Sequence, residues 1–394
     1  MRTMDQLEVA GKRVLVREDL NVPLVRDGER VRILDATRVD AAVPTLRLLR
    51  ERHARIIVLS HLGRPGGHPD PGCSLRPVAA LLAEHLGAPV DFASDCIGEP
   101  AQRAVDRLRD GDVLLLENVR FHPGEERNDP TFARALAALG DAYVDDAFGT
   151  AHRAHASTEA IAHMLPSAAG PLMEAEIAAL QPLMNAPATP YVCVIGGAKV
   201  KDKVGVLSAL AQRVTAFCIG GGMANTLLAA RGVDVGRSLR DEDLDPARRI
   251  LALALERGVT IHLPIDAIVS SGFDADEGAH AVAIDAVGDG TILDIGPATA
   301  AAYARVIEAA KTIVFNGPMG VYEKPAYRSG TKAVGEAIAR ATAAGATSVV
   351  GGGDAAAAAH LLGFADRMTH VSTGGGATLE FLEGKTLPGV AALQ

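Results

Sequence analysis

Basic side chains in the first half of the chain follow short apolar runs, at the points where strands would end. The carboxyl ends of parallel strands gather at one sheet edge, so we expect these groups to converge. Arginine presents a planar fork that binds phosphate and carboxylate bidentately, which predicts a pocket for a small polyanion. The alternative is that they are scattered surface arginines, as we expect Arg47 and Arg50 to be. The residues placed in this way are Arg17, His61, Arg64, Arg120, His152, Arg153 and His155, and Arg38 starts a predicted helix.

Lysines are distributed differently. None occurs between Lys12 and Lys199, and then Lys199, Lys201 and Lys203 follow the Gly196-Gly197 turn closely. Lysine is a mobile point charge, suited to following a phosphoryl group that moves. A compositional bias toward arginine would explain why lysines are few, but it would not explain this cluster.

Glycine turns follow most strand candidates of the second half. At the carboxyl edge of a parallel sheet, backbone N–H groups at helix starts attract phosphate. Two familiar phosphate motifs are missing: there is no G-x-G-x-x-G after a strand, and Leu379 replaces the first glycine that a Walker motif ending at Gly384-Lys385-Thr386 would need. The turns are Gly196-Gly197, Gly220–Gly222, Gly317–Gly320, Gly351–Gly353 and Gly374–Gly376.

The elements that would position these residues alternate between β-branched runs and Ala/Leu/Arg-rich segments. The runs are almost wholly apolar, as in parallel strands that are buried on both faces. Repeated strand–helix units predict an α/β fold of two doubly wound, parallel, Rossmann-like sheets. Helical segments are expected at Leu75–Leu86, Pro100–Arg109 and Ala301–Ala310. Strands are expected at Val14–Val16, Ile56–Ser60, Val113–Leu116, Ala142–Val144, Tyr191–Ile195, Ala216–Ile219, Thr260–Leu263, Thr312–Phe315, Ser348–Val350 and Thr369–Ser372.

A length of 394 residues suggests two domains. The alternation of strand and helix candidates is interrupted between Pro166 and Pro190, a region that contains a helical segment at Leu172–Leu183. We therefore expect an N-terminal domain at 1–170, an interdomain helix and linker at 171–190, and a C-terminal domain at 191–385. The stretch Asp266–Asp294 is expected to be a short β excursion, with no function assigned to it.

Composition excludes several classes of function. The net charge of −9 and an aromatic content of 4% argue against a nucleic-acid or anionic-membrane partner. Cys73, Cys96, Cys193 and Cys218 form no C-x-x-C pair, which favours buried free thiols in a reducing compartment. No signal peptide is evident, because Met1–Arg13 is charged and lacks an apolar core. No spanning helix is expected either, because prolines interrupt the longest uncharged run, Ile177–Ala198. We expect a cytoplasmic protein.

From about Val9 to Leu393 the chain resembles the phosphoglycerate kinase family. Eight ordered segments make the resemblance highly specific. They are Arg17-x-Asp-x-Asn-Val-Pro23, Ser60-His-Leu-Gly-Arg-Pro65, Asp146-Ala-Phe-Gly-Thr-Ala-His-Arg-Ala-His155, Gly196-Gly-Ala-Lys-Val200, Gly220-Gly-Gly-Met-Ala224, Asn316-Gly-Pro-Met-Gly-Val321, Gly351-Gly-Gly-Asp354 and Ser372-Thr-Gly-Gly-Gly376.

The resemblance implies reversible transfer of the acyl phosphate of 1,3-bisphosphoglycerate to MgADP, giving 3-phosphoglycerate and MgATP, by in-line transfer with domain closure. It implies a monomer whose C-terminal tail, 386–394, returns to the first domain. Catalytic roles are implied for Arg38, Lys199, Gly375 and Gly376. The phosphoglycerate would be bound by Asp19, Asn21, Arg38, His61, Arg64, Arg120 and Arg153. The nucleotide would be bound by Gly197, Ala198, Lys199, Lys203, Gly221, Gly222, Asn316, Pro318, Met319, Glu323, Gly353 and Asp354, with Mg²⁺ at Asp354.

Three positions depart from the family's usual pattern. Ala355 stands where Thr or Ser is common, Asp145 where Asn is common, and Lys201 where a small polar residue is common. We expect tuned affinity and retained activity. The attacking oxygen is already ionised in either direction, so no general base is needed, and positioning with fixed positive charge should dominate catalysis. Because an acyl phosphate hydrolyses readily, we expect a hinge within Pro166–Pro190 that excludes water on closure.

Two alternative functions remain open from the sequence. A two-domain nicotinamide dehydrogenase would share the architecture, but the dinucleotide fingerprint is missing. A nucleotide-binding pseudokinase is suggested only by Ala355, whereas Lys199, Asp354 and Arg38 are all present.

Overall fold

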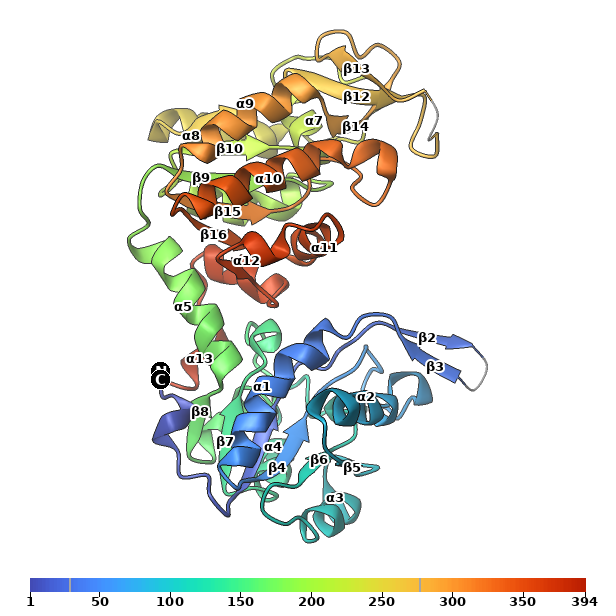
Figure 1. Ribbon diagram of the computed structural model, residues 1–394, viewed down its shortest axis with the longest axis vertical. Coiled ribbons are helices and arrows are strands. Elements are labelled where there is room, and N and C mark those ends of the chain that lie inside the picture. The colour runs from blue at the N-terminus through green and yellow to red at the C-terminus, as the bar shows by residue number, and fades with distance from the viewer. Residues whose placement is uncertain (28–29, 276–277) are drawn as a thin grey trace. The chain divides into compact units, whose positions relative to one another are not determined.

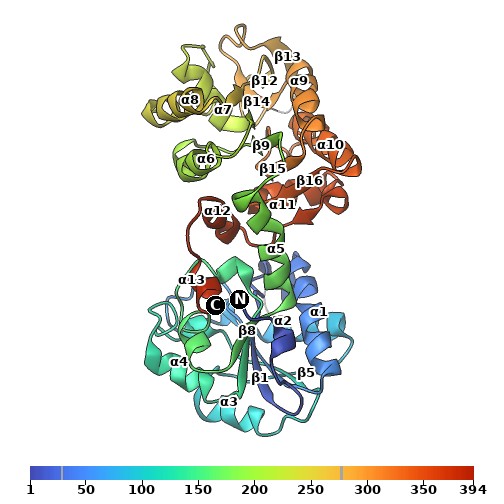
Figure 2. The ribbon, with the colours of Figure 1, turned by 90° about the vertical axis from the view of Figure 1, so that its left-hand side faces the viewer.

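The computed structural model describes residues 1–27, 30–275 and 278–394. It divides into two compact units, Met1–Ala178 with Thr386–Gln394, and Ala179–Lys385. The division falls inside helix α5 (Pro171–Asn185). Figures 1 and 2 show a sheet flanked by helices in each unit.

The first unit is built on a six-stranded parallel sheet in the order β5-β6-β4-β1-β7-β8. From β1 the chain passes to β4, β5 and β6 on one side and then to β7 and β8 on the other, so the switch point of the sheet lies between β1 and β7. The strands are β5 (Val90–Phe92), β6 (Val113–Leu115), β4 (Arg55–Leu59), β1 (Arg13–Arg17), β7 (Ala142–Asp145) and β8 (Ser167–Ala169). The helices are α1 (Thr37–Glu51), α2 (Arg76–Leu86), α3 (Gly98–Val105), α4 (Pro130–Ala137) and α13 (Pro388–Ala391), and β2 (Leu24–Asp27) pairs with β3 (Arg30–Ile33) in a hairpin.

Side chains on both faces of this sheet are buried. Val14 and Val58 belong to a core that includes Leu46 of α1 and Leu82 of α2, while Leu15, next to Val14 in β1, is also fully buried. The nearly continuous apolar runs of the sequence arise from this burial on two sides.

Both chain ends belong to the first unit. Thr3 bridges to Ala169 of β8, and Arg2 N donates to Leu393 O at 3.1 Å. The N and C labels lie side by side in both ribbon views. The last residues of the chain therefore pack beside the outermost strand of the first sheet.

The second unit contains a parallel sheet in the order β11-β10-β9-β15-β16-β17. Here the order reverses between β9 and β15. The strands are β11 (Thr260–His262), β10 (Ala216–Ile219), β9 (Tyr191–Ile195), β15 (Thr312–Asn316), β16 (Thr347–Val350) and β17 (His370–Val371). The helices are α6 (Val204–Leu210), α7 (Gly221–Ala230), α8 (Asp245–Arg257), α9 (Pro297–Glu308), α10 (Ser329–Ala343), α11 (Gly353–Leu361) and α12 (Gly376–Leu382).

The irregular stretch Asp266–Asp294 forms a small antiparallel sheet, apart from residues 276–277, which lie outside the described residues. Its order is β13 (His280–Ala283), β12 (Asp266–Ser270) and β14 (Thr291–Ile295). The expected β excursion is thus present.

Several elements of the structure were not predicted from the sequence, and some predicted bounds differ from the observed ones. The strands β5 and β8 and the β2–β3 hairpin were not predicted. Ser167–Ala169 is a strand within the region we expected to interrupt the sheet, because its small residues carry no β-branched signal. The helix expected at Pro100–Arg109 is α3, which begins at Gly98 and ends at Val105, and the strand expected at Thr369–Ser372 is reduced to His370–Val371.

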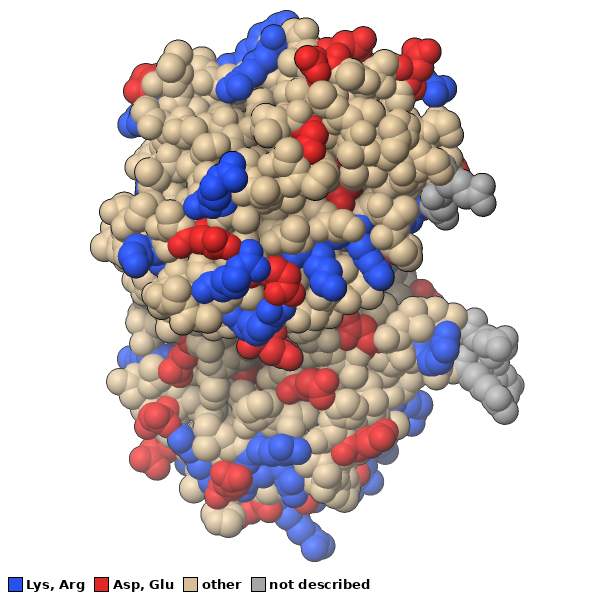
Figure 3. All heavy atoms as spheres, turned by 45° about the horizontal axis from the view of Figure 1, so that its top comes forward, with Lys and Arg blue, Asp and Glu red and all other residues tan. Residues whose placement is uncertain are grey.

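Across the described ranges, the structure has no helix of the length and apolar character needed to cross a membrane. In the face shown in Figure 3, acidic and basic side chains are interspersed over much of the surface.

Candidate active site

Arg17 ends β1 at the switch point of the first sheet, and its guanidinium is almost completely buried. Its Nε donates to Ser157 Oγ at 2.9 Å, its Nη1 donates to the carbonyl of Glu18, and its Nη2 lies 3.1 Å from His61 Nδ1. His61 follows β4, the neighbouring strand, and is also buried. The ends of two adjacent strands thus place a buried cation against an imidazole.

Four basic side chains act electrostatically on His61. Burial is the main cause that lowers the pKa of His61 well below its usual value, and Arg17, Arg120, Arg38 and His155 lower it further. Arg120 is in turn influenced by Arg17 and Arg153, and its pKa is lowered mainly by burial. We call this set the basic cluster: Arg17, Arg38, His61, Arg120, Arg153 and His155.

Arg38 and Arg120 are held by hydrogen bonds and ion pairs. Arg38, in the first turn of α1, pairs with Asp19. Arg120, in the 3₁₀ turn η3 (Val119–Phe121), donates from Nη1 to Gly63 O at 2.9 Å, and its Nε lies 3.3 Å from Glu126. These contacts fix guanidinium groups that would otherwise repel one another.

The other residues of this unit that were predicted to bind the substrate differ in their hydrogen bonds and in their exposure. Asn21 accepts a hydrogen bond from Gly63 N at 2.9 Å, which links the loop after β1 to the loop after β4. Arg153 donates to His152 Nε2 at 3.1 Å, whereas Arg64 is exposed.

A buried carboxylate balances part of the basic cluster. Glu125 accepts hydrogen bonds from Ser157 N and Ser157 Oγ at 2.9 and 2.7 Å, and its Oε1 lies 3.7 Å from His155 Nδ1. Burial raises the pKa of Glu125, while Arg17 opposes that rise. Burial and the surrounding arginines lower the pKa of His155 to about 4. Both histidines are consequently neutral near pH 7, and the positive charge resides on the arginines.

The second unit contains a cavity of 590 Å³ at the carboxyl edge of its sheet. This volume lies within the range of small-molecule sites. Its wall includes eight of the residues predicted to bind a nucleotide: Gly197, Ala198, Gly221, Gly222, Pro318, Met319, Glu323 and Asp354.

Two glycine turns meet at the switch point between β9 and β15. A Cβ on Gly196 would lie 1.9 Å from Pro318 O, so no other residue fits there without moving the backbone. A Cβ on Gly222, in the first turn of α7, would lie 2.4 Å from Ala198 O. These glycines therefore serve close approach of the cavity-forming loops.

Lys203 and Asn316 are joined beside this switch point. Lys203 Nζ donates to Asn316 Oδ1 at 2.6 Å, and Asn316 Nδ2 donates to Gly351 O at 2.6 Å. Burial lowers the pKa of Lys203 to about 8, and the nearby Asp354 opposes this shift. Lys199 lies elsewhere, in a separate hollow of 400 Å³ that it lines with Lys201, Arg240 and Asp241. The structure thus places two of the predicted lysines in different surroundings.

Part of the cavity wall was not predicted from the sequence. It comes largely from β14 and from residues that follow β12 and precede α10. The signals available in the sequence were the irregular stretch at 266–294, to which no function was assigned, and the Gly317–Gly320 turn with Val321. The additional residues are Asn225, Arg237, Leu239, Phe273, Thr291, Ile292, Leu293, Asp294, Gly320, Val321 and Tyr322.

Asp354 and Ala355 point to different surroundings in the first turn of α11. Asp354 is exposed and lines the cavity, whereas Ala355 is buried in the apolar core with Phe315 and Phe364. Gly353 begins α11, and Gly376 begins α12 after Gly375, whose φ is 52°. The departure at Ala355 therefore lies in the core and leaves the carboxylate of Asp354 in the wall.

The fold and these sites define a class: two-unit α/β proteins with a partly buried, arginine-rich cluster on one parallel sheet and a glycine-lined cavity on another. The phosphoglycerate kinase family model matches residues 4–385. Phosphoglycerate kinases of Methylorubrum extorquens and Thermomicrobium roseum are 51% and 53% identical to this chain, each match covering 100% of it and 98% or 99% of the relative. The chain belongs to the phosphoglycerate kinase family.

Solved structures agree with this assignment. The structure of phosphoglycerate kinase from Coxiella burnetii matches with a TM-score of 0.88 and 41% identity, covering 99% of this chain and 98% of that one. That of the enzyme from Pyrococcus horikoshii matches with a TM-score of 0.87 and 32% identity, covering 100% and 98%. Both matches span the two units, and the predicted fold class is confirmed.

Proposed function

We propose that this chain transfers a phosphoryl group between the acyl phosphate of 1,3-bisphosphoglycerate and MgADP, forming 3-phosphoglycerate and MgATP. The observation that carries the proposal is that this member of the family has two different sites, one in each unit. Fixed arginines form the basic cluster of the first unit, and a nucleotide-sized cavity lies at the glycine turns of the second.

The first unit would bind the phosphoglycerate. Its phosphate and carboxylate are small rigid anions, which arginine forks bind with defined geometry. Arg120 is pre-oriented by Gly63, and Asn21 and Asp19 order the neighbouring loop. Neutral His61 and His155 can accept or donate hydrogen bonds without changing the charge of the site near pH 7. We assign these groups to orientation of the substrate, because the reaction moves no proton.

The second unit would bind ADP or ATP. The apolar wall of Leu239, Phe273 and Met319 suits a base, and Glu323 offers a carboxylate to the ribose hydroxyls. Gly197 and Ala198 would bring backbone groups close to the phosphates, and Lys203 is held by Asn316 near Asp354. Lys199 follows Ala198 directly in the chain and would also contact the phosphates, although its side chain lines the separate hollow with Lys201.

The magnesium ion would enter with the nucleotide. Asp354 is an exposed carboxylate in the cavity wall, and Mg²⁺ in nucleotide sites is commonly held by one or two carboxylates plus the phosphates. The residues present thus fit the ion, which would neutralise charge on the phosphate oxygens. Lys203 and Arg38 would supply the remaining fixed positive charge from the chain itself.

Catalysis would rest on positioning and electrostatics. The attacking oxygen is an ionised carboxylate or phosphate, and the main barrier is the repulsion between two anions. An arginine that meets the transferring group can supply roughly 10³–10⁵ in rate in related reactions, and Arg38 is the candidate here.

A coupled assay tests this proposal. Full-length protein, MgADP and enzymatically generated 1,3-bisphosphoglycerate should yield ATP, and omission of either substrate should abolish the signal. Tight nucleotide binding without turnover would favour a pseudokinase and overturn the proposal. Oxidation of NADH in the absence of kinase substrates would instead favour a dehydrogenase.

A further inference from the structure

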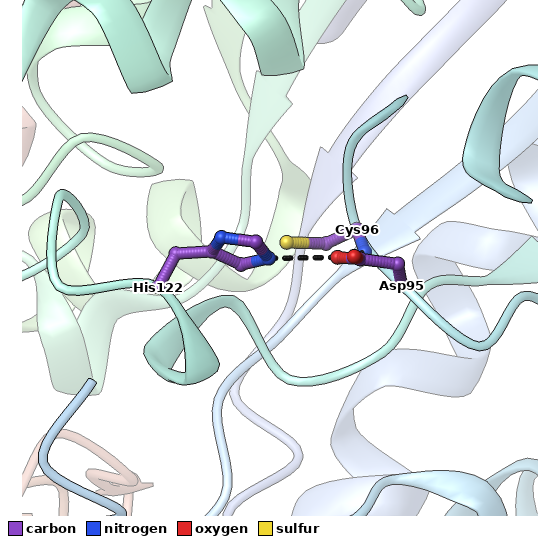
Figure 4. A group of neighbouring side chains, drawn as sticks. All are labelled: Asp95, Cys96 and His122. Carbon is purple, nitrogen blue, oxygen red and sulfur yellow. Dashed lines mark hydrogen bonds and ion pairs between the residues drawn. The ribbon is translucent and has the colours of Figure 1, made fainter. Parts of the chain in front are cut away.

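A cysteine, a histidine and an aspartate converge in the first unit, away from the assigned roles. Asp95 and Cys96 lie between β5 and α3, and His122 follows η3. One potential ligand atom from each residue lies within 4.8 Å of the others, and this is the one such group found among the residues that the structure describes. Figure 4 shows the imidazole, the thiol and the carboxylate facing one another.

The three side chains offer donors of a borderline-soft metal site. Zn²⁺ lies about 2.3 Å from a thiolate sulfur and about 2.0–2.2 Å from nitrogen and oxygen ligands, so the ligands of a tetrahedral ion are roughly 3.3–3.7 Å apart. His122 Nε2 is 2.7 Å from Asp95 Oδ1, so these two atoms must separate by under about 1 Å to admit the ion. Both side chains are partly exposed, at 27% and 38%, which allows such a movement.

The site has a route for entry. Asp95 and His122 line a hollow of 530 Å³, whereas Cys96 lies fully buried behind them. A metal ion can therefore arrive through the hollow, meet three protein ligands and retain an open position toward it. Such a three-ligand arrangement with one open position is found in zinc sites that bind a water or a small anion.

The surrounding charges favour a cation. Asp95 and Glu117 contribute carboxylates to the wall of the hollow. The hollow also contains Asp70 and one cation, Arg76, whose guanidinium stacks over Phe92 at 4.5 Å. Glu117 is already engaged with Ser74 Oγ and the amides of Leu75 and Asn118. The wall of the hollow thus carries three carboxylates against one guanidinium, which favours a bound cation.

We propose that Asp95, Cys96 and His122 form a binding site for a divalent transition metal of the Zn²⁺ type. On binding, Cys96 releases its thiol proton to solvent and coordinates as a thiolate, while His122 binds as the neutral imidazole. The ion would tie the β5–α3 loop to the turn that carries Arg120.

Titration of the metal-free full chain with Co²⁺ and Zn²⁺, without nucleotide, tests the proposal. We expect one Co²⁺ per chain with a thiolate-to-metal charge-transfer band, displacement of Co²⁺ by Zn²⁺, and proton release seen by calorimetry in buffers of different ionisation enthalpy. Absence of the charge-transfer band at millimolar Co²⁺ would overturn the proposal.

Matched variants locate the ion. Cys96→Ser should abolish the band, and Asp95→Asn and His122→Gln should each weaken the affinity for Co²⁺ about 100-fold or more, since even residues that only hydrogen-bond to metal ligands typically contribute 10–100-fold. His85→Gln is the control, because His85 forms a similar pair with Asp40 at 2.6 Å without a cysteine in the cluster. A band that persists in Cys96→Ser, or that is lost in His85→Gln, would overturn the assignment. If Cys96→Ser does not fold, the partly exposed Asp95→Asn provides the deciding measurement.

Discussion

Arg17 and His61 are joined across two adjacent strand ends, with Arg17 Nη2 3.1 Å from His61 Nδ1. A guanidinium can only donate, so Nδ1 is the acceptor and the proton of the neutral imidazole lies on Nε2. This relationship defines the tautomer of His61 and leaves its Nε2–H as a hydrogen-bond donor. A protonated His61 would direct two N–H groups at an environment that is already cationic.

The first prediction concerns that tautomer. Nitrogen NMR of imidazole-labelled protein should show His61 as the neutral Nε2–H form throughout the range in which an ordinary histidine becomes protonated, because burial and then Arg17 and Arg120 lower its pKa well below its usual value. Loss of the same signals in His61→Gln gives the assignment. A titration midpoint near the ordinary value of about 6.5 would contradict the prediction.

The second prediction concerns Arg38. Arg38→Ala should lower kcat by roughly 10³-fold or more, with little change in the nucleotide KM, because the lost charge acts on the transferring group. Steady-state kinetics measures both quantities. Arg47→Ala, an exposed position of the same helix, is the control and should be unaffected. An unchanged kcat in Arg38→Ala would show that Arg38 does not stabilise the transition state.

The third prediction concerns the pH dependence of nucleotide binding. Burial lowers the pKa of Lys203 to about 8, so its ammonium form is lost as the pH rises through that value. ATP binding, measured by calorimetry, should therefore weaken between about pH 7 and 9. Lys203→Arg should flatten this dependence, because arginine stays charged.

A matched pair of variants tests the same lysine at constant pH. Lys203→Ala should weaken ATP binding roughly 10–100-fold, as expected for loss of a charge-assisted hydrogen bond. The exposed Lys332→Ala should leave it unchanged. Equal effects of the two substitutions would indicate a general loss of positive charge.

The fourth prediction concerns Asp294, whose carboxylate accepts hydrogen bonds from Gly330 N and Ile295 N at 2.7 and 2.9 Å. Burial raises its pKa to about 7. Between its unfolded value of about 4 and that pKa the native state binds the extra proton, so rising pH lowers the free energy of unfolding by about 1.4 kcal/mol per pH unit from this group.

Urea unfolding at several pH values between about 5 and 7 measures the slope. Asp294→Asn should remove this contribution, so the variant should lose less stability than the parent as the pH rises. Parallel slopes in the two proteins would show that Asp294 does not bind the extra proton.

The fifth prediction concerns closure. Transfer of a hydrolysable acyl phosphate requires exclusion of water, so the presence of both substrates should make the chain more compact than either one alone. Small-angle scattering with 3-phosphoglycerate and a non-hydrolysable MgATP analogue measures the radius of gyration. A value as large as that of the free protein would argue against a closing hinge within Pro166–Pro190.

Much of the fold was predictable because parallel strands buried on both faces leave long apolar runs, as at Tyr191–Ile195 and Thr312–Asn316. The strand Ser167–Ala169 was not, since its small residues are indistinguishable from a loop without the neighbouring β7. The same holds for β14, whose role as cavity wall depends on its packing beside the glycine turns.

The sequence by itself determined the family, the two α/β sheets and the residue types available for phosphoryl transfer, because ordered motifs and apolar strand runs are local properties. Tertiary structure decided which of those residues meet. It paired Lys203 with Asn316, which lies 113 residues away in the sequence. It also placed Lys199 in a different hollow and buried Ala355 in the core. It also assembled Asp95, Cys96 and His122, which no sequence motif connects. Strand order and packing, which the linear spacing of residues does not contain, bring such groups together.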